Sequence, residues 1–590
     1  MWWARDPARF HLELAGMNEL QARASWLKGL AWRVSSELVP EVSLILEVHG
    51  KEYELTLVYP EFFPDAPAYV RPTDNRQRLS GHQYGVGGSL CLESRPDNWT
   101  REVTGAELVE SAHRLLAAEK DPDTPATVPS AHKTTVGQDA RGTWNRLVLS
   151  GSVVSMLREM PDRSSARFQG AFVVHDVAEG NVARVAFVLK LGTPGSEPLP
   201  VPDVPQALAT TGPLWNVDYE GIVLKDESFK AIRSMQTMGD LWAALEAAGF
   251  ARAVLDLPAQ ESTQTPSRLV MLASSGDALA WFLRADGETF SLSPAHVVSA
   301  GPGGRLPQTA SDLTSKKVGI VGLGSVGSKV AASLARSGVR RFLLIDGDLL
   351  LPENLVRHEL SWASVGMHKA SALSQELALL APEVEVVQHL HDVGGQESPA
   401  RANQVFKQLG DCDLIIDATA DPYVFADLAA LARVRRRPIC WGEVFAGGLG
   451  ALVARARPDL DPNPMSVRNA IDAYLQGLPP APHRDARGYD GQPGSMLVAY
   501  DSDVAQLAAV LTRMCIDILV GSTESTFPHP AYLIGYRKGW LEAPFDTRPI
   551  DATGDGWDDP AGPVDQDLLA SAVSFVTKAL QERAHAEPSA

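Results

Sequence analysis

A glycine-rich turn between an apolar run and an amphipathic segment holds the residues best suited to chemistry. Residues 318–321 form the apolar run, and residues 330–334 repeat their apolar side chains at helical spacing. The turn between them contains Gly322, Gly324 and Gly327. Glycines let a backbone approach a phosphate closely, and a helix N-terminus offers free N–H groups and a positive dipole end. The pattern therefore predicts a strand, a phosphate-binding turn and a helix.

An acidic residue ends the next predicted strand, residues 341–345. Asp346 follows the last of the three glycines by about 20 residues, the spacing at which an acid commonly holds a ribose hydroxyl. Taken alone, the glycines and this acid indicate a Rossmann domain of a nicotinamide or flavin oxidoreductase as strongly as a domain with any other nucleotide chemistry.

Polar residues further along the chain point to different chemistry. They are Asp348, Asn354, Arg357, Lys369 and Asp421. A dehydrogenase does not need such a set. An enzyme that brings a carboxylate onto the α-phosphate of ATP does, because the triphosphate requires cations and Mg²⁺ requires an acid.

These motifs, in this order, resemble the ThiF-type adenylating family over about residues 313–519. That family activates ubiquitin and the sulfur carriers of molybdopterin and thiamine synthesis. The resemblance implies that the three glycines and Asp348 line the nucleotide, that Asp346 binds ribose, that Asn354, Arg357 and Lys369 contact phosphates, and that Asp421 lies by Mg²⁺. It also implies a homodimer that adenylates the C-terminal glycine carboxylate of a ubiquitin-like protein, with Arg305 as the nearest candidate for an upstream arginine.

A lone cysteine in a second glycine-rich stretch is the other candidate for chemistry. Cys91 ends the segment G-H-Q-Y-G-V-G-G-S-L-C, and Trp99 follows it. Before it the sequence predicts a helix at 7–27, hairpin strands at 41–48 and 51–58, and a proline-rich crossing at 59–67. After it, Thr104 and Glu107 form a capping box that opens a helix.

This order of features resembles the ubiquitin-conjugating fold over about residues 5–120. The resemblance implies that the Cys91 thiolate accepts an acyl group as a thioester and passes it on. The asparagine that the family carries upstream, for the developing oxyanion, is missing here. His82 is the nearest match to that motif, either as a catalytic aid or as a structural residue.

Bulk properties narrow the class of protein. The net charge of −19 argues against a nucleic-acid binder. No apolar run reaches about 18 residues, and the first residues lack a signal-peptide pattern, so neither a membrane span nor export is expected. The 4 cysteines are scattered with no C-x-x-C pair, which argues against structural zinc and disulfides and fits the cytoplasm.

The expected fold class is α/β multidomain. A ubiquitin-conjugating-like α+β domain is expected at 1–120, followed by a linker at 121–145 and a middle α/β domain at 146–305. A Rossmann-like ThiF adenylation domain is expected at 306–545, and a C-terminal tail at 546–590 contains one helix at 568–580. Cys440 and Cys515 lie in patterns typical of core. Residues 464–500 occupy the place where ubiquitin-activating relatives often carry an acceptor cysteine in a loop, and they contain none.

The main hypothesis is a fused enzyme that adenylates a ubiquitin-like protein with MgATP and transfers it through Cys91 to a target. It resembles bacterial fused activating–conjugating proteins of phage-defence operons. Cys440 as an intermediate carrier is a variant of this hypothesis. The alternatives are an adenylation-only enzyme of the sulfur-carrier type, an NAD(P)-dependent oxidoreductase and a silent scaffold, against which the intact phosphate-binding set argues.

Overall fold

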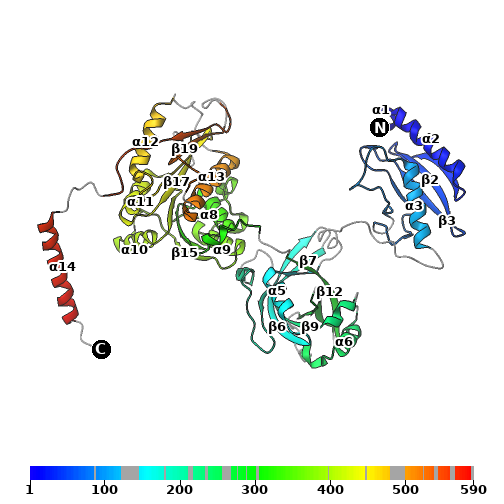
Figure 1. Cartoon of the computed structure of the whole chain (residues 1–590), viewed down its shortest axis with the longest axis horizontal. Helices are drawn as coiled ribbons and strands as arrows, with labels where there is room; N and C mark the ends of the chain where they lie inside the picture. The colour runs from blue at the N-terminus through cyan, green and yellow to red at the C-terminus, as the bar shows by residue number, and fades with distance from the viewer. Residues whose placement is uncertain are drawn as a thin grey trace. The chain divides into compact units, whose positions relative to one another are not determined.

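The computed structural model divides the chain into two compact units, residues 1–139 and 140–590 (Figure 1). It describes residues 1–84, 88–120, 145–177, 181–209, 217–232, 235, 237–255, 268–275, 277–286, 289–300, 305–395, 397–445, 448–478, 499–521, 524–536, 543–558 and 565–586. Within these ranges, no helix has the length and apolar character required to cross a bilayer.

The first unit is a four-stranded antiparallel sheet with the order β1-β2-β3-β4, and its two long helices contact each other and the sheet. Its elements are α1 (Trp2–Arg5), α2 (Pro7–Arg23), β1 (Leu27–Val34), β2 (Pro40–Val48), β3 (Lys51–Val58), β4 (Tyr69–Pro72) and α3 (Gly105–Glu119). The strand expected at 51–58 is confirmed, as is the capping box of Thr104 and Glu107 at the start of α3. The helix expected at 7–27 ends at Arg23, because Leu27 already pairs with β2.

A buried carboxylate ties α2 to the start of α3. Glu13 is 1% exposed, and its Oε2 accepts hydrogen bonds from the Tyr59 hydroxyl at 2.8 Å and the Gly105 amide at 2.7 Å. Arg9 pairs with its other oxygen at 2.8 Å. Burial raises the pKa of Glu13 above its ordinary value, against the lowering effect of these three partners.

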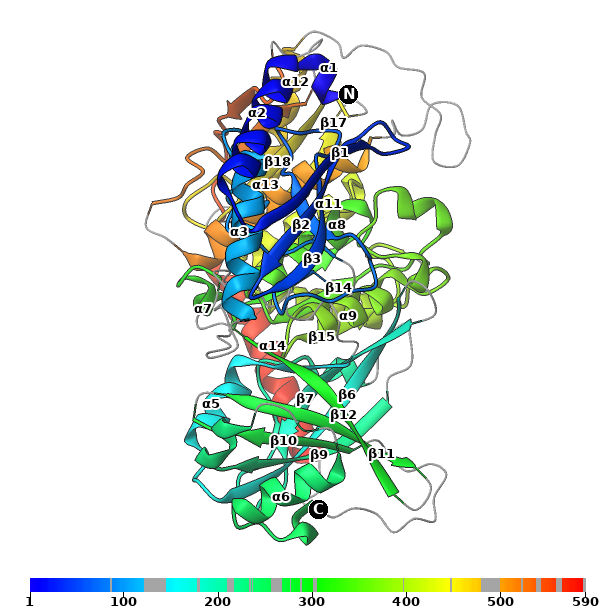
Figure 2. The same cartoon turned by 90° about the vertical axis from the view of Figure 1, so that its right-hand side faces the viewer.

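The second unit begins with a mainly β region whose sheet closes on itself. Its strands follow the order β5-β12-β11-β10-β9-β6-β7, and β5 pairs with both β12 and β7. Figure 2 labels β6, β7 and the strands from β9 to β12 of this sheet. The elements are β5 (Asn145–Leu149), α5 (Gly151–Glu159), β6 (Ser164–Val177), β7 (Asn181–Leu191), β8 (Leu199–Pro200), β9 (Val217–Lys225), α6 (Met238–Ala247), β10 (Arg268–Ala273), β11 (Ala278–Asp286) and β12 (Thr289–Ser299). Both helices and strands were expected in this region, but their closure into a barrel was not.

Aromatic side chains fill the barrel where the strands carry glycine. A Cβ on Gly221 would lie 2.1 Å from the Phe168 ring, and one on Gly170 would lie 2.4 Å from the Tyr219 hydroxyl. Phe168 and Tyr219 are both buried, and the Tyr219 hydroxyl donates to the Phe187 carbonyl at 3.0 Å. The interior is therefore a packed core.

A second eight-stranded sheet follows, with the order β15-β14-β13-β16-β17-β18-β19-β20. The strands from β15 to β17 are parallel, and the remaining ones are antiparallel. The strands are β13 (Lys317–Val321), β14 (Arg341–Ile345), β15 (Glu385–His389), β16 (Leu414–Asp417), β17 (Ile439–Phe445), β18 (Gly450–Ala456), β19 (Ala531–Gly535) and β20 (Thr547–Ile550). The strand order reverses between β14 and β16 around β13, and open α/β sheets bind ligands at such a switch point.

Helices cover both faces of this sheet and bury one apolar cluster on each. One face carries α8 (Ser325–Ser337), α9 (Lys369–Leu380) and α13 (Asp501–Val520). The other carries α10 (Pro399–Gly410), α11 (Pro422–Arg435) and α12 (Pro464–Gln476). The short helix α7 (Ala310–Leu313) precedes β13, and α14 (Gln566–Ala586) lies in the tail. The α/β layering expected for this region is confirmed.

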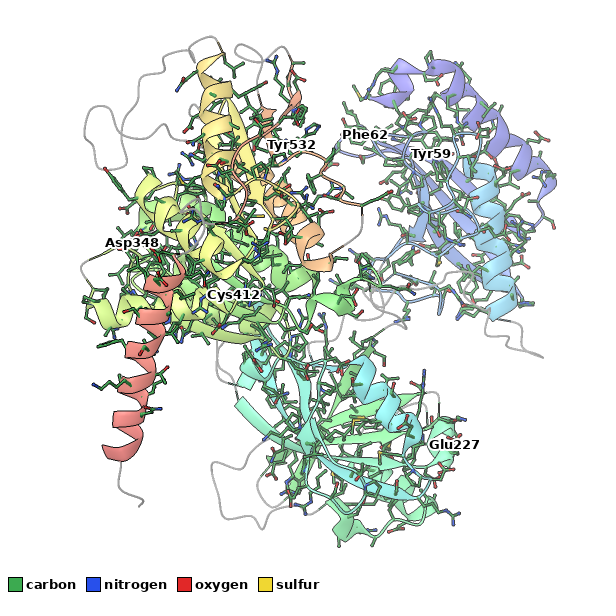
Figure 3. All side chains as sticks on the ribbon, turned by 60° about the vertical axis from the view of Figure 1, so that its left-hand side comes forward. Tyr59, Phe62, Glu227, Asp348, Cys412 and Tyr532 are labelled. Carbon is green, nitrogen blue, oxygen red and sulfur yellow. The ribbon has the colours of Figure 1, made fainter. Side chains whose placement is uncertain are left out.

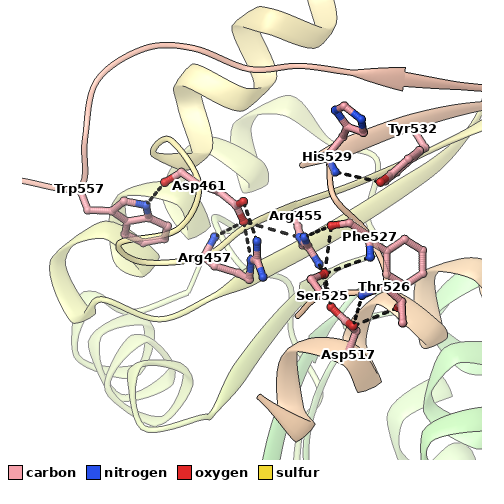
Figure 4. Close-up of polar contacts among 10 residues, drawn as sticks. All are labelled: Arg455, Arg457, Asp461, Asp517, Ser525, Thr526, Phe527, His529, Tyr532 and Trp557. Atoms are coloured by element: carbon pink, nitrogen blue, oxygen red, sulfur yellow. Dashed lines mark hydrogen bonds and ion pairs between the residues drawn. The ribbon is translucent and has the colours of Figure 1, made fainter. Parts of the chain in front are cut away.

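A fully buried arginine joins three segments of this sheet region (Figure 4). Arg455, at the end of β18, is 0% exposed and lies 3.0 Å from the Asp517 carboxylate in α13 and 3.6 Å from that of Asp461. It also donates to the Ser525 hydroxyl and the Phe527 carbonyl, just before β19. Burial acts to raise the pKa of Asp517, but hydrogen bonds from Ser525 and Thr526 and the arginine charge leave that pKa below its ordinary value.

Two expectations about the C-terminal part need correction. Residues 464–476, expected to begin a long loop, form the helix α12, which Asn463 caps through its side chain. The helix expected at 568–580 extends over Gln566–Ala586. Most of the linker, 121–144, and residues 479–498 lie outside the described part of the chain.

Candidate functional site

The glycine turn after β13 has the geometry that phosphate binding requires. Gly322 has φ +83°, a conformation that favours glycine, and a Cβ there would lie 2.9 Å from the Thr419 amide nitrogen. A Cβ on Gly327 would lie 2.0 Å from the Gly322 carbonyl oxygen. Gly324 precedes α8, and a Cβ added to it would meet no described heavy atom within 4 Å, so the helix N-terminus faces open space.

Asp346 holds the glycine turn in place and is buried at 8% exposure. One carboxylate oxygen accepts from the Leu323 amide at 2.6 Å, and the other accepts from the Asp348 amide at 2.9 Å. Burial raises the pKa of Asp346 above its ordinary value, although Lys369 and these amides act to lower it. Each oxygen retains acceptor capacity for a ribose hydroxyl, because an ionised carboxylate has about four lone-pair sites.

A lysine at the first position of α9 lies beside this acid. Lys369 is 8% exposed, and its ammonium lies 2.7 Å from the Asp348 carboxylate. The Asp348 side chain, labelled in Figure 3, is 70% exposed. The Lys369 amide also donates to the Asp348 carbonyl at 3.0 Å. The structure therefore brings three predicted residues, Asp346, Asp348 and Lys369, to the carboxyl end of β14.

A histidine for which the sequence predicted no role completes the support of the turn. The Nε2 of His358 lies 2.9 Å from the Leu323 carbonyl, and its Nδ1 accepts from the Leu360 amide at 3.2 Å. Nε2 therefore carries the proton and donates to Leu323. Burial lowers the pKa of His358, which keeps the ring neutral. Residues 353–358 read E-N-L-V-R-H, but Leu323, the partner of His358, lies 35 residues away in the sequence.

Two predicted phosphate-binding residues are engaged within the protein. The Asn354 side-chain oxygen accepts from the Leu351 amide at 2.9 Å and so caps the short 3₁₀ turn Pro352–Val356. Arg357 is 7% exposed and donates to the Ala499 carbonyl at 3.3 Å. Arg305 is exposed.

The acid expected near Mg²⁺ caps the helix that follows β16. One oxygen of Asp421 accepts from the amides of Tyr423 at 2.7 Å and Val424 at 3.3 Å, while its side chain is exposed. Two residues before it, Thr419 packs against the glycine turn. The described ranges contain no group of three or more His, Cys, Asp and Glu side chains placed to hold a metal ion. Mg²⁺ that is carried by phosphates needs only one or two protein carboxylates, so Asp421 fits that role.

The lone cysteine of the first unit lies in a small ladder of backbone hydrogen bonds. The Cys91 amide donates to the His82 carbonyl at 2.7 Å, and the Tyr84 amide donates to the Ser89 carbonyl at 3.0 Å. The Tyr84 hydroxyl lies 3.6 Å from the Cys91 sulfur. Burial, together with the hydrogen bond and charge of Cys91, raises the pKa of Tyr84 to about 12, so the phenol keeps its proton at neutral pH.

Cys91 also differs from the other cysteines in exposure. It is half-buried, whereas Cys412, Cys440 and Cys515 are each 0% exposed. Burial raises the pKa of Cys515, and the neighbouring Cys440 adds to this effect. The prediction that Cys440 and Cys515 belong to the core is confirmed, and Cys440 is wrong as a candidate carrier, because a fully buried sulfur cannot meet an acylated partner.

Comparison with known proteins defines the class of the C-terminal region. Residues 304–465 match the model of the ThiF family, so this region is a ThiF-family domain. Uncharacterized protein y4qC of Sinorhizobium fredii is 29% identical over 239 residues, which are 38% of this chain and 40% of that protein.

Two further proteins are similar to this chain. The ATP-dependent ubiquitin transferase-like protein Cap2 of Enterobacter hormaechei is 38% identical over 123 residues, 21% of this chain and 20% of that protein. A crystal structure of E. coli MccB with succinimide aligns at 16% identity and a TM-score of 0.32, over 43% of this chain and 67% of that one. The chain thus spans two fifths or less of the length of the curated relatives named here.

Proposed function

We propose that the chain uses ATP to adenylate the C-terminal carboxylate of a ubiquitin-like protein and then carries that protein as a thioester on Cys91. The observation that carries the proposal is the convergence of the glycine turn, Asp346 and the Lys369–Asp348 pair at one edge of a ThiF-family sheet. This edge offers amide donors, an acceptor for ribose and a cation for phosphate in one place.

In the first step, a carboxylate oxygen of the ubiquitin-like protein attacks the α-phosphorus of ATP. The bond from that phosphorus to the bridging oxygen breaks, and pyrophosphate leaves with the electron pair. The amides of the glycine turn hold phosphate oxygens, and Lys369 stabilises their negative charge, with Asn354 and Arg357 as further contacts. Asp421 would hold Mg²⁺, which neutralises charge on the departing pyrophosphate when it is bound.

In the second step, the Cys91 thiolate attacks the acyl carbon of the adenylate. A carbon–sulfur bond forms, the bond to the phosphate oxygen breaks, and AMP leaves. A target amine then attacks the thioester, the carbon–sulfur bond breaks, and the thiolate is regenerated as the amine loses a proton to solvent. The exposure of Cys91 relative to the three buried cysteines supports this assignment. The Tyr84 hydroxyl lies beside the sulfur, and His82 is bonded to Cys91 through its backbone carbonyl, so these two residues are the candidates for assistance.

The partners follow from this chemistry. A ubiquitin-like protein and a target protein are the two macromolecular substrates, in the cytoplasm, and a second copy of the chain would pair through the ThiF-family domain and could supply Arg305. Bacterial antiviral defence is the setting of the fused enzymes that the sequence resembles.

Intact-protein mass spectrometry under non-reducing conditions tests the proposal, with the chain, MgATP and the ubiquitin-like protein encoded beside it. We expect a mass increase equal to that protein, removed by dithiothreitol, absent in Cys91→Ala and retained in the matched control Cys440→Ala. An adduct that persists in Cys91→Ala would refute the assignment of Cys91.

Adenylation without conjugation is a second candidate, and one observation favours it. Gln83 follows His82, in the stretch where the conjugating family carries the side-chain amide that stabilises the oxyanion. The Gln83 side-chain oxygen already accepts from the Leu79 amide at 2.9 Å, and its side-chain nitrogen donates to the Gln77 carbonyl at 3.1 Å. Pyrophosphate release in the same assay with no covalent adduct would support this candidate. Tight NADH binding that is insensitive to Lys369→Ala would instead support an oxidoreductase.

A further inference from the structure

A buried histidine whose ring nitrogens make no hydrogen bond within the described ranges lies just beyond β15. His391 is 8% exposed, and neither its Nδ1 nor its Nε2 has a partner among the described residues. The ring of His389 lies beside it, with the two centroids 5.2 Å apart. Buried polar atoms in folded proteins are nearly always paired, and leaving one unpaired costs free energy. A ligand that binds here would give one of these two nitrogens a hydrogen-bond partner.

The backbone on both sides of His391 is tied to the residues that would hold ribose. The Asp346 amide donates to the His389 carbonyl at 3.2 Å, and the Gly347 amide donates to the Asp392 carboxylate at 3.0 Å. His391 therefore lies between two residues that are each bonded to the turn after β14. A nucleotide held by Asp346 has this segment as its neighbour.

The order of the strands fixes the direction in which the nucleotide extends. The glycine turn follows β13, Asp346 follows β14, and β15 is the next strand in the sheet. If the phosphates bind at the end of β13 and the ribose at the end of β14, the base lies beyond the end of β15. His391 is a buried polar side chain at that position, with both ring nitrogens available within the described part of the chain.

We propose that His391 hydrogen-bonds the edge of the purine base and contributes to the choice of nucleotide. This inference rests on the proposed function, because it requires a nucleotide at this edge. A neutral imidazole offers one donor and one acceptor. The adenine edge offers an amino group that donates and ring nitrogens that accept, so either kind of group can form one hydrogen bond with a ring nitrogen of His391.

The test compares ATP with ribose 5-triphosphate, which lacks the base, by isothermal titration calorimetry on the full chain. In His391→Phe we expect ATP affinity to fall about 3- to 10-fold, the effect of one lost neutral hydrogen bond, while affinity for ribose 5-triphosphate stays unchanged. His391→Gln keeps a donor and an acceptor and should lie between the two. The control His529→Phe removes a histidine that pairs with Asp551 and should leave both affinities unchanged.

Thermal unfolding without nucleotide separates a binding role from a structural one. Because both nitrogens lack a partner among the described residues of the free protein, the second unit of His391→Phe should unfold at an unchanged or higher temperature. ATP should raise the unfolding temperature of that unit less than in the wild type. Unchanged ATP affinity in His391→Phe, or equal losses for ATP and ribose 5-triphosphate, would overturn the inference while the proposed function stands. A wild-type chain that binds neither compound would overturn both.

Discussion

Replacing Arg455 by alanine tests the network that joins β18, α13 and the segment before β19. Among the ion pairs of the described residues, Arg455 is the only arginine that contacts the Asp517 carboxylate, and the change removes it. Asp461 keeps its bond to Arg457 at 2.8 Å, and Asp517 keeps its hydrogen bonds from Ser525 and Thr526. One buried carboxylate thus loses its counter-charge. Breaking a buried pair from one side costs about 3–5 kcal/mol.

Hydrogen exchange followed by mass spectrometry measures this cost within the full chain, where unfolding is not a single transition. Peptides from β18 and α13 should lose protection by roughly 10²- to 10⁴-fold in Arg455→Ala. The control is Arg401→Ala, which removes the exposed pair between Arg401 in the first turn of α10 and Glu397 just before that helix. Exposed pairs contribute little, so protection should stay close to that of the wild type.

The refuting result is equally specific. If Arg455→Ala and Arg401→Ala change the exchange of α13 to the same small extent, the buried arginine does not stabilise the packing of α13 on β18. A further variant that replaces Arg455 by methionine and Asp517 by leucine should recover part of the loss, because apolar residues of similar size often substitute for a buried pair without cost.

Three further predictions concern other parts of the chain. The raised pKa of Glu13 means that its ionisation destabilises the first unit as pH rises through the folded-state pKa. The hydrogen-exchange protection of α3 in Glu13→Gln, relative to the wild type, should therefore increase as the pH rises from acidic to neutral. A ratio of the two protections that does not change with pH would contradict this. Gly327→Ala should disturb the folded turn, whereas Gly324→Ala should fold normally and weaken only nucleotide binding, as circular dichroism and calorimetry would show. Gly221→Ala should destabilise the barrel by about 1–3 kcal/mol, because the added Cβ would meet the buried Phe168 ring. The control Gly239→Ala, whose Cβ would make only an ordinary contact, should not destabilise it; limited proteolysis measures both.

Local periodicity carried the predictions that the structure confirms. The strand at 341–345 and the strand at 51–58 have the predicted bounds, because each is a short apolar or alternating run bounded by turn residues. The capping box at Thr104 is likewise a local signal. The glycine turn was recognisable because its residue types are required by the backbone itself.

Features that depend on distant partners were not predictable. Closure of the barrel requires β5 to pair with both β7 and β12, and no local pattern specifies partners. Arg455 lies at a strand end where an exposed side chain is the ordinary expectation, and its carboxylate partner in α13 is 62 residues away. In the sequence, His358 and His391 look like any other histidines, and only the fold places them beside the glycine turn and the turn after β14.

The burial of the other cysteines leaves the folded chain with a single thiol that a reagent can reach. Three of its 4 cysteines are fully buried in the second unit, whereas Cys91 is half-buried in the first unit and accessible to a thiol reagent. A maleimide should therefore label the folded protein once, in the first unit, without removal of any cysteine. Each additional label reports an opening of the second unit, so the number of labels follows the unfolding of that unit in one mass spectrum.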